Sequence, residues 1–287
     1  MLIDLQLHST YSDGYMTPTE VVKFIKKQGV KVASLTDHNT VGGVDEFILA
    51  CQKNSIKPVV GMELYVKLGN HKFNLLWYNF DYNNPFLHKF LRDSHIRRRA
   101  QVRNILEKLS RRGFKLSIGK ILDKYNRYIP INRIVDDFMT VKENSIKVKK
   151  ILRNKDPREE EIISEFFRNK GIGILRESYM SIGRILNLRK KIGGQLIVCH
   201  PAKSRYINKD IWDKLKKIGL DGVEVLSPHH SIGAVMYIQQ LARELDFVET
   251  GGSDFHRYEG GNFLLQNSWE YYQIDSKYLR KINKIIG

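Results

Sequence analysis

Short apolar runs alternate with amphipathic stretches along most of the chain. Each apolar run is long enough for one strand, and the stretches between the runs carry apolar residues at the spacing of an α-helix. The predicted strands cover residues 1–7, 32–36, 58–66, 71–80, 195–199, 222–226 and 247–250. The predicted helices cover residues 18–28, 44–53, 85–112, 181–192, 209–218 and 232–245. This alternation predicts an α/β fold, in the form of a β/α barrel with irregular closure.

The first helix has recognisable ends in the sequence. Thr17 and Glu20 have the spacing of a capping box, and Pro18 occupies the first helical position. Gly29 lies where a glycine commonly ends a helix. These residues predict a helix from residue 18 to about residue 28.

The stretch after the fourth predicted strand differs from the rest in its charge. The chain has 48 Lys and Arg against 31 Asp and Glu, a net charge of +17, and residues 92–160 alone hold 20 basic and 9 acidic residues. We predict that residues 91–171 form an inserted basic helical subdomain, with shorter helices after its first long one, and that residues 1–90 and 172–287 form the barrel. Clustered positive charge favours an anionic partner. A composition biased by AT-rich coding DNA is the alternative explanation.

Composition excludes several classes of protein. With 42% hydrophobic residues, the 287-residue chain can form a packed core. It has no run of about 20 apolar residues, so no membrane partner is expected. The first residues lack the basic and apolar runs of a signal peptide. Cys51 and Cys199 lie in apolar stretches and are expected to be buried free thiols, which favours a cytoplasmic location.

Chemically active side chains follow six of the predicted strands, at the face where β/α barrels hold their active sites. One histidine after a strand is usually structural. The repetition favours a metal centre, because imidazole and carboxylate groups together suit zinc, manganese or iron. Beside this centre, Gly251 and Gly252 are expected to allow a close approach of two backbone segments. The candidate metal ligands are His8, Asp13, His38, Glu63, His200, Asp254 and His256.

Several ordered motifs resemble those of the PHP (polymerase and histidinol phosphatase) superfamily. They are DLQLHS at 4–9, SDG at 12–14, LTDHNT at 35–40, GME at 61–63, CHP at 199–201 and GSDFH at 252–256. The chain is most similar to the stand-alone branch of nucleotide phosphoesterases and 5′-3′ exoribonucleases, which residues 98–105 and 219–231 also match. The resemblance implies a distorted (β/α)7 barrel with an inserted helical subdomain. It also implies one to three divalent metal ions, manganese, zinc or iron, and hydrolysis of phosphate esters by a metal-activated water.

The resemblance also implies roles for individual residues. Asp13, His38 and His256 match one complete metal site. Glu63 matches a carboxylate that bridges two ions, with His8 and Asp254 beside it, and His200 matches a ligand of the second ion. The implied catalytic residues are Glu63, Asp254 and His230, and the last of these matches a histidine near the substrate.

Two ligand positions depart from the family pattern. The first histidine of the opening motif is replaced by Gln6, and the histidine of the fourth strand is replaced by Asn74. His71 lies three residues before Asn74, on the opposite face of a regular strand, and could substitute only through a β-bulge. An Arg-x-His pair of the family insertion is also missing, since residues 130–132 are Pro-Ile-Asn.

These observations support two hypotheses. The first is a metal-dependent phosphoesterase acting on nucleotides or on the 5′ ends of short RNA or other single-stranded oligonucleotides. The second is a degenerate, non-catalytic domain that binds a metal and an anionic or nucleic-acid ligand. In either case Lys203, Arg205, Arg98 and Arg99 are candidate contacts to phosphate. No protein partner is indicated.

Overall fold

The fold is described from a computed structural model, for residues 1–125, 128–203, 209–257 and 272–287. Contacts divide the chain into two units, Met1–His88 with Tyr179–Gly287, and Lys89–Ser178. These limits lie near those predicted for the barrel and the insertion. That residues 91–171 fold as a separate domain stays a prediction.

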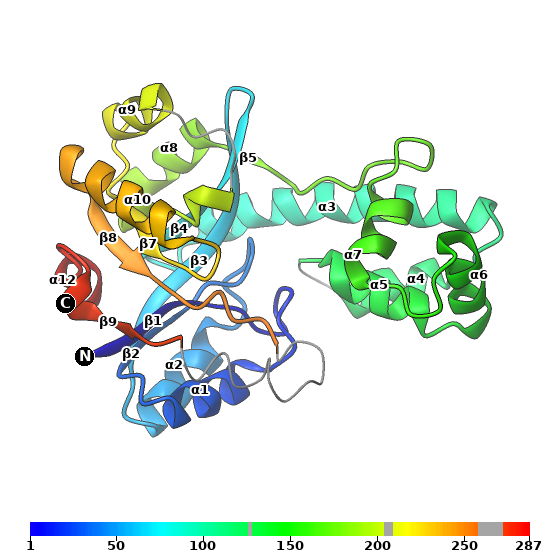
Figure 1. The fold of residues 1–287 in the computed structure, drawn as a ribbon, viewed down its shortest axis with the longest axis horizontal. Coiled ribbons are helices and arrows are strands. Elements are labelled where there is room, and N and C mark those ends of the chain that lie inside the picture. Colours follow the sequence, from blue (N-terminus) through cyan, green and yellow to red (C-terminus); the bar gives the residue numbers. More distant parts are fainter. Residues whose placement is uncertain (126–127, 204–208, 258–271) are drawn as a thin grey trace. The chain divides into compact units, whose positions relative to one another are not determined.

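The strands of the first unit form one nine-stranded sheet in the described part of the chain (Figure 1). Its order is β8-β7-β6-β4-β3-β2-β1-β9, and β5 pairs with β3. The seven predicted strands are present, whereas β5 and β9 have only two residues each and were not predicted. The strands are β1 (Leu2–Leu7), β2 (Val32–Leu35), β3 (Lys57–Leu68), β4 (His71–Tyr78), β5 (Met180–Ser181), β6 (Gln195–Val198), β7 (Gly222–Leu226), β8 (Val248–Gly251) and β9 (Ile274–Asp275).

Most pairs in this sheet are parallel. The parallel pairs are β1–β2, β2–β3, β3–β5, β6–β7 and β7–β8, whereas β4 runs antiparallel to both β3 and β6, and β9 runs antiparallel to β1. A bridge between Leu7 and Phe255 joins β1 to the segment after β8, so the sheet is nearly closed. The predicted α/β barrel with irregular closure is therefore confirmed, and the reversed strand β4 is one source of the distortion.

Helices cover the sheet of the first unit. α1 and α2 pack on one side through a core cluster that includes Phe24, Phe47, Cys51 and Phe255. The bounds are α1 (Pro18–Lys27), α2 (Val44–Lys53), α8 (Ile182–Ile192), α9 (Lys209–Lys217), α10 (Ile232–Glu244) and α12 (Asn283–Ile286). None of the described helices has the length and apolarity needed to cross a bilayer.

The ends of α1 follow the prediction. The Thr17 hydroxyl accepts a hydrogen bond from the backbone of Glu20, and the Glu20 carboxylate accepts one from the backbone of Thr17. Gly29 has a φ of 78°, in the left-handed region that ends helices. The capping box and the glycine stop are confirmed.

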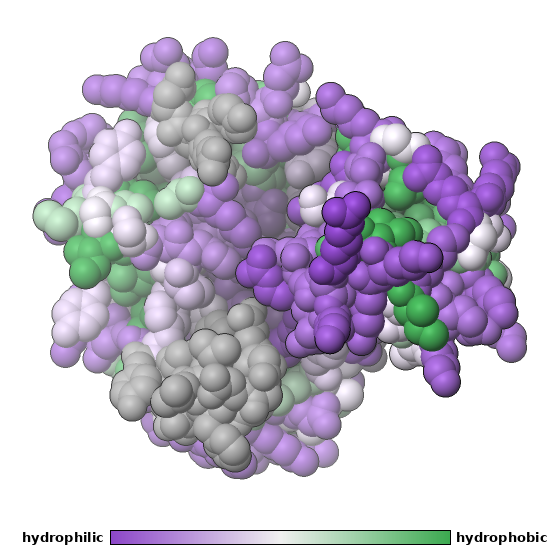
Figure 2. Space-filling model, turned by 45° about the vertical axis from the view of Figure 1, so that its right-hand side comes forward, coloured by the Kyte–Doolittle hydropathy of each residue, from purple (hydrophilic) through white to green (hydrophobic). Residues whose placement is uncertain are grey.

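The second unit is helical and has its own core. α3 (Pro85–Arg111) begins in the first unit and continues into the second, where α4 (Ile118–Lys124), α5 (Ile131–Met139), α6 (Lys142–Leu152) and α7 (Glu159–Ile162) follow. The face of this unit seen in Figure 2 is mostly hydrophilic, with smaller hydrophobic patches. Its core includes Leu106, Leu109, Phe114, Ile134, Phe138, Val148, Phe166 and Phe167.

Two glycines allow close backbone packing beside the barrel end, as predicted. A Cβ atom on Gly252 would lie 2.4 Å from the Gln6 Cβ, and one on Gly251 would lie 2.8 Å from the Leu226 Cβ. Both distances are too short for real contacts, so only glycine lets the end of β8 lie against β7 and the residue after β8 lie against β1.

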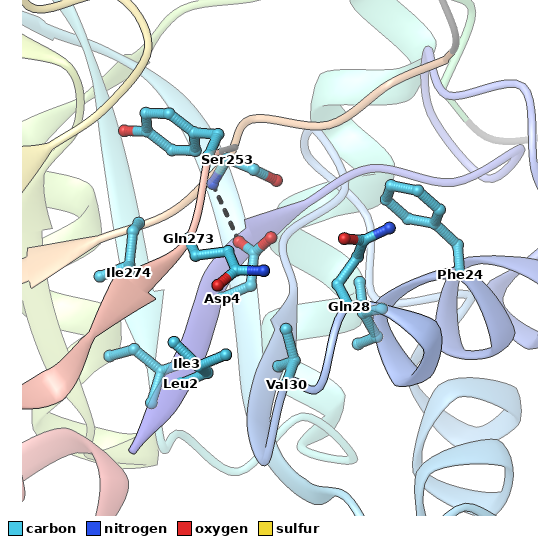
Figure 3. A pocket seen from close by; sticks show the side chains of 11 residues that line it. Leu2, Ile3, Asp4, Phe24, Gln28, Val30, Ser253, Gln273 and Ile274 are labelled. Carbon is cyan, nitrogen blue, oxygen red and sulfur yellow. Dashed lines mark hydrogen bonds between the residues drawn. The ribbon is translucent and has the colours of Figure 1, made fainter. Parts of the chain in front are cut away.

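Asp4 is a buried carboxylate on β1 that lines a small pocket together with Phe24, Gln28, Ser253 and Gln273 (Figure 3). Its Oδ1 accepts a hydrogen bond of 2.9 Å from the Ser253 backbone N–H. Burial raises the pKa of Asp4 to about 6, and the hydrogen bonds from Ser253 only partly oppose this effect.

We expect Gly252→Ala to lower the free energy of unfolding by about 1–3 kcal/mol, because the new methyl group overpacks the contact with Gln6. Gly119→Ala is the matched control, since a Cβ at Gly119 would meet nothing within 4 Å. In a helix this control should be neutral or stabilising by up to about 1 kcal/mol. Urea unfolding of both variants measures the difference, and equal effects would contradict the close approach.

Asp4 should also make stability depend on pH. Because folding raises its pKa from 3.8 to about 6, the folded chain holds the proton more tightly. The contribution to stability is fully present below pH 3.8 and is lost as pH rises to about 6, up to about 3 kcal/mol. Asp4→Asn cannot ionise, so the stability of the native chain relative to this variant should fall across that range in urea unfolding. A constant difference would contradict the shift.

Candidate metal centre

Among the described residues of the first unit, three connected groups of potential metal ligands are present. In each group the ligand atoms lie within 4.8 Å of one another. His8 belongs to the first two groups and Glu63 to the last two, so the groups are connected. The groups are His8, Asp13, His38 and His256; His8, Glu63 and Asp254; and Glu63, Cys199 and His200. All seven candidate ligands of the sequence analysis are among them.

The strand pattern explains why these side chains meet. Gln6 and His8 are two positions apart on β1 and its end, so they point to the same side, and both are fully buried. His200 follows β6 closely, and Asp254 follows β8. Parallel strands bring these ends to one rim of the sheet, and Glu63 reaches the same rim from β3.

Asp13 is the centre of the first group. Its Oδ1 lies 3.2 Å from His256 Nε2, and its Oδ2 lies 3.4 Å from His38 Nε2. Burial acts to raise the pKa of Asp13, but His256 and His38 outweigh it and hold the pKa well below its usual range. The carboxylate therefore stays charged and faces two imidazole nitrogens, an arrangement that suits a divalent cation.

A backbone contact orients one of these imidazoles. His256 Nδ1 lies 2.6 Å from the carbonyl oxygen of Asp254, and since a carbonyl only accepts, Nδ1 carries the proton. In the neutral ring the lone pair is then on Nε2, the nitrogen that faces Asp13. Such an outer contact commonly fixes the tautomer of a metal-binding histidine.

His8 connects the first group to the second. Its Nε2 lies 3.1 Å from Glu63 Oε2 and 3.1 Å from Asp254 Oδ1. This nitrogen nevertheless has no hydrogen bond of good geometry among the described residues. An imidazole nitrogen without a hydrogen bond, facing two carboxylate oxygens across one small space, fits a cation between them.

Glu63 extends the centre into the third group. Its second oxygen, Oε1, lies 3.2 Å from His200 Nε2. Burial acts to raise the pKa of Glu63, yet His38 and His200 lower it well below the usual value. One ionised carboxylate thus faces a histidine with each oxygen, and its predicted role as a bridge between two ions stays a prediction.

The backbone is strained at three places around this rim. Asn39, His200 and Asp254 have φ values of 52°, 25° and 52°, in the left-handed region that non-glycine residues rarely adopt. Such conformations persist where surrounding contacts impose them, and they are frequent at functional sites.

The two substituted positions contact Glu63 directly. Gln6 Nε2 donates a hydrogen bond of 3.0 Å to Glu63 Oε2, and Asn74 Nδ2 donates one to Glu63 Oε1. His71 is exposed at the start of β4, opposite Leu68, and regular pairing runs from there through Asn74. The bulge that could have brought His71 to the site is absent from this described hairpin.

Two adjacent histidines after β7 take different positions. His229 Nε2 lies 2.6 Å from Asp254 Oδ2, whereas His230 Nδ1 donates to the carbonyl oxygen of Val225. Burial lowers the pKa of His230, so its ring is neutral at pH 7. Of these two residues only His230 was predicted to lie near the substrate. The only signal for His229 in the sequence was its place in the same Pro-His-His segment.

Glu224 is a further acidic group beside the centre, and it was not among the predicted ligands. It is fully buried on β7, and its Oε2 accepts a 2.7 Å hydrogen bond from the backbone of His200. Burial raises the pKa of Glu224 well above the usual value. The signal that could have identified it was an acidic residue between two valines of a predicted strand.

The candidate phosphate contacts differ in their surroundings. Lys203 Nζ lies 3.9 Å from Asp254 Oδ2 and is half-exposed. Arg98 is buried within the second unit, where it donates to the carbonyls of Ile129 and Arg176. Arg99 is paired with exposed Asp123. Arg205 lies outside the described residues.

Comparison with known families agrees with this geometry. The PHP domain family matches residues 4–172, more than half of the chain. The chain belongs to the PHP family. The match includes the segments that carry His8, Asp13, His38 and Glu63 of this PHP domain, whereas His200, Asp254 and His256 lie beyond it.

Curated relatives match the PHP protein over most of its length. A 5′-3′ exoribonuclease of Haemophilus influenzae is 25% identical over 257 residues, which cover 88% of this chain and 89% of the relative. A 3′,5′-nucleoside bisphosphate phosphatase of Chromobacterium violaceum is 25% identical over 268 residues, which cover 88% of this chain and 87% of the relative.

A solved structure supports the PHP fold. A Bifidobacterium adolescentis protein, described provisionally as a metal-dependent phosphoesterase, aligns with a TM-score of 0.74 at 20% identity. The alignment covers 91% of this chain and 89% of that protein. At this identity the likeness shows the fold of the PHP domain and not its activity.

We expect His256→Ala to weaken binding of a divalent cation in the first group at least about 10–100-fold, the loss typical even of outer contacts to metal ligands. His71→Ala is the matched control, because exposed His71 lies away from the three groups. Calorimetric titration of chelator-treated protein with Mn²⁺ measures both. Equal affinities and stoichiometries for the two variants would contradict the assignment.

Proposed function

We propose that this PHP protein is a metal-dependent phosphoesterase that hydrolyses phosphate esters of nucleotides or of short RNA and other single-stranded oligonucleotides at their 5′ ends. The observation that carries the proposal is the connected set of three ligand groups, joined through His8 and Glu63. The named activities of the relatives support the substrate class, because both enzymes act on phosphate esters of nucleotides or RNA.

The side chains of the centre fit divalent cations. His8 Nε2 lies within 3.1 Å of two carboxylate oxygens without forming a hydrogen bond among the described residues. Imidazole and carboxylate donors suit manganese, zinc or iron, and we propose one to three such ions. Bound there, the ions would supply Lewis acidity and activate water for attack on phosphorus.

The chain's own residues have distinct proposed roles. Glu63 connects the second and third groups and fixes the distance between them, since its two oxygens face His8 and His200. Asp254 lies between His8 and His229 and keeps the second group charged, because His256 and His229 lower its pKa although burial acts to raise it. His230 holds its proton on Nδ1 against Val225, which leaves the Nε2 lone pair to accept a hydrogen bond from a substrate hydroxyl group.

Substrate phosphate is proposed to contact Lys203, the described candidate beside the metal centre. Its ammonium group is half-exposed and lies near Asp254 and His229. Arg205 follows closely in sequence and is retained as a proposed contact. Arg98 and Arg99 already pair within the second unit, so any phosphate contact would compete with those pairs.

The remaining proposals concern the cellular compartment and whether the protein is catalytic. The described cysteines, Cys51 and Cys199, are free, which supports the proposed reducing cytoplasm. No specific observation favours the non-catalytic alternative, since the curated relatives named above are hydrolytic enzymes. Gln6 and Asn74 replace the expected histidines but still contact Glu63.

Hydrolysis is tested by phosphate release from a 3′,5′-bisphosphonucleotide and from a 5′-phosphorylated oligonucleotide in the presence of Mn²⁺. We expect turnover that a chelator abolishes, and Asp254→Asn should lower kcat/KM at least about 100-fold through loss of a ligand. Exposed Asp156→Asn is the control and should keep the native rate. Native turnover no higher than that of Asp254→Asn would contradict the proposal.

A further inference from the structure

Cys199 has unusual surroundings for a buried thiol. It is fully buried between β6 and His200. Its Sγ lies 3.5 Å from Glu63 Oε1 and 3.7 Å from Glu224 Oε2. Cys51, in contrast, belongs to the apolar cluster beneath α1 and α2, where a thiol acts as a small hydrophobic group. The single S–H can donate a hydrogen bond to only one of these two oxygens at a time, so neither hydrogen bonding nor apolar packing accounts for both contacts.

The third group has the spacing of ligands around one zinc ion. In a tetrahedral site, usual zinc bond lengths put a sulfur ligand about 3.5 Å from an oxygen ligand and a nitrogen ligand about 3.3 Å from it. Here Cys199 Sγ lies 3.5 Å and His200 Nε2 lies 3.2 Å from Glu63 Oε1. Glu63 Oε1 therefore lies at distances from both the sulfur and the imidazole nitrogen that shared coordination requires, and all three ligand atoms lie within 4.8 Å of one another.

Gln6 provides outer hydrogen bonds to the same group. Its Nε2 donates to Cys199 Sγ at 3.1 Å and to Glu63 Oε2 at 3.0 Å. The reverse orientation of the amide would bring its oxygen against the Glu63 carboxylate. Donors of this kind orient and stabilise anionic metal ligands. Gln6 thus donates hydrogen bonds to two of the ligands. A residue that bound the metal directly from this position would not donate these hydrogen bonds.

Glu224 places a second buried polar group without a full set of partners beside this site. The carboxylate is fully buried, and its Oε1 has no hydrogen-bond partner among the described residues. Its other oxygen is 3.7 Å from Cys199 Sγ. A buried carboxyl oxygen without a partner is costly, and this one belongs to the same cluster as Glu63 and Cys199.

We propose that Cys199 is a thiolate ligand of the metal ion that Glu63 and His200 bind, and that it gives this site a preference for zinc over manganese. Thiolate sulfur is a soft ligand that selects zinc, whereas carboxylate-rich sites suit manganese. The thiol proton passes to solvent when the metal–sulfur bond forms. This inference rests on the proposed metal centre and is independent of which ester is hydrolysed.

Cobalt substitution tests the metal–sulfur bond directly. Co²⁺ replaces Zn²⁺ in such sites, and a thiolate–cobalt bond gives an intense near-ultraviolet charge-transfer absorption that imidazole and carboxylate ligands lack. The chain has two cysteines, so Cys51→Ala leaves Cys199 as its only thiol. We expect the native chain and Cys51→Ala, loaded with Co²⁺ as verified by elemental analysis, to show this absorption. Cys199→Ser should lose it.

A metal competition provides the second measurement. Cys199→Ser should lower the Zn²⁺ affinity of this site at least about tenfold, while its Mn²⁺ affinity changes by less than about threefold. Absence of the charge-transfer absorption in cobalt-loaded Cys51→Ala would overturn the proposal even if Cys199→Ser does not fold. Phosphate release without the absorption would refute the thiolate alone, and the absorption without phosphate release would refute the proposed function alone.

Discussion

The electrostatic demand of one buried carboxylate organises the candidate metal centre. Glu63 is fully buried yet ionised, and such a charge is costly in a protein interior unless opposite charges or hydrogen bonds compensate it. His8 and His200 face its two oxygens, while Gln6 and Asn74 donate hydrogen bonds to them. The proposed cations would complete this compensation and would explain why so much acidity is buried together.

The sheet makes this convergence possible by bringing together segments that are far apart in the sequence. β1 and its end supply Gln6 and His8, β3 supplies Glu63, and the segments after β6 and β8 supply His200 and Asp254. The close approach at Gly252 brings the segment after β8 against β1. The same architecture therefore determines both the distortion of the barrel and the spacing of the ligand groups.

Much of this arrangement could be predicted from the sequence, because its patterns are local. Apolar runs gave the seven longer strands, and the capping residues Thr17 and Glu20 gave the start of α1. The reversed direction of β4 could not be derived from its own residues, since pairing partners determine it. The two-residue strands β5 and β9 were too short to form a pattern.

In the metal centre, the sequence predicted which side chains gather but not how each one is used. His229 and His230 are adjacent, and only the turn after β7 determines which of them contacts Asp254. Gln6 and Asn74 looked like weakened ligands, whereas the structure shows them donating hydrogen bonds to Glu63. Arg98 looked like an anion contact, but its partners are distant in the sequence and bury it.

Anomalous X-ray diffraction from crystals grown with zinc and manganese tests the central claim most directly. Maps calculated from data at each metal edge locate and identify ions independently of activity. The account predicts density between Asp13, His38 and His256, and zinc density between Glu63, Cys199 and His200. The claim would be contradicted if crystals grown with both metals showed no anomalous density at either place. In that case the carboxylates and imidazoles would contact only one another.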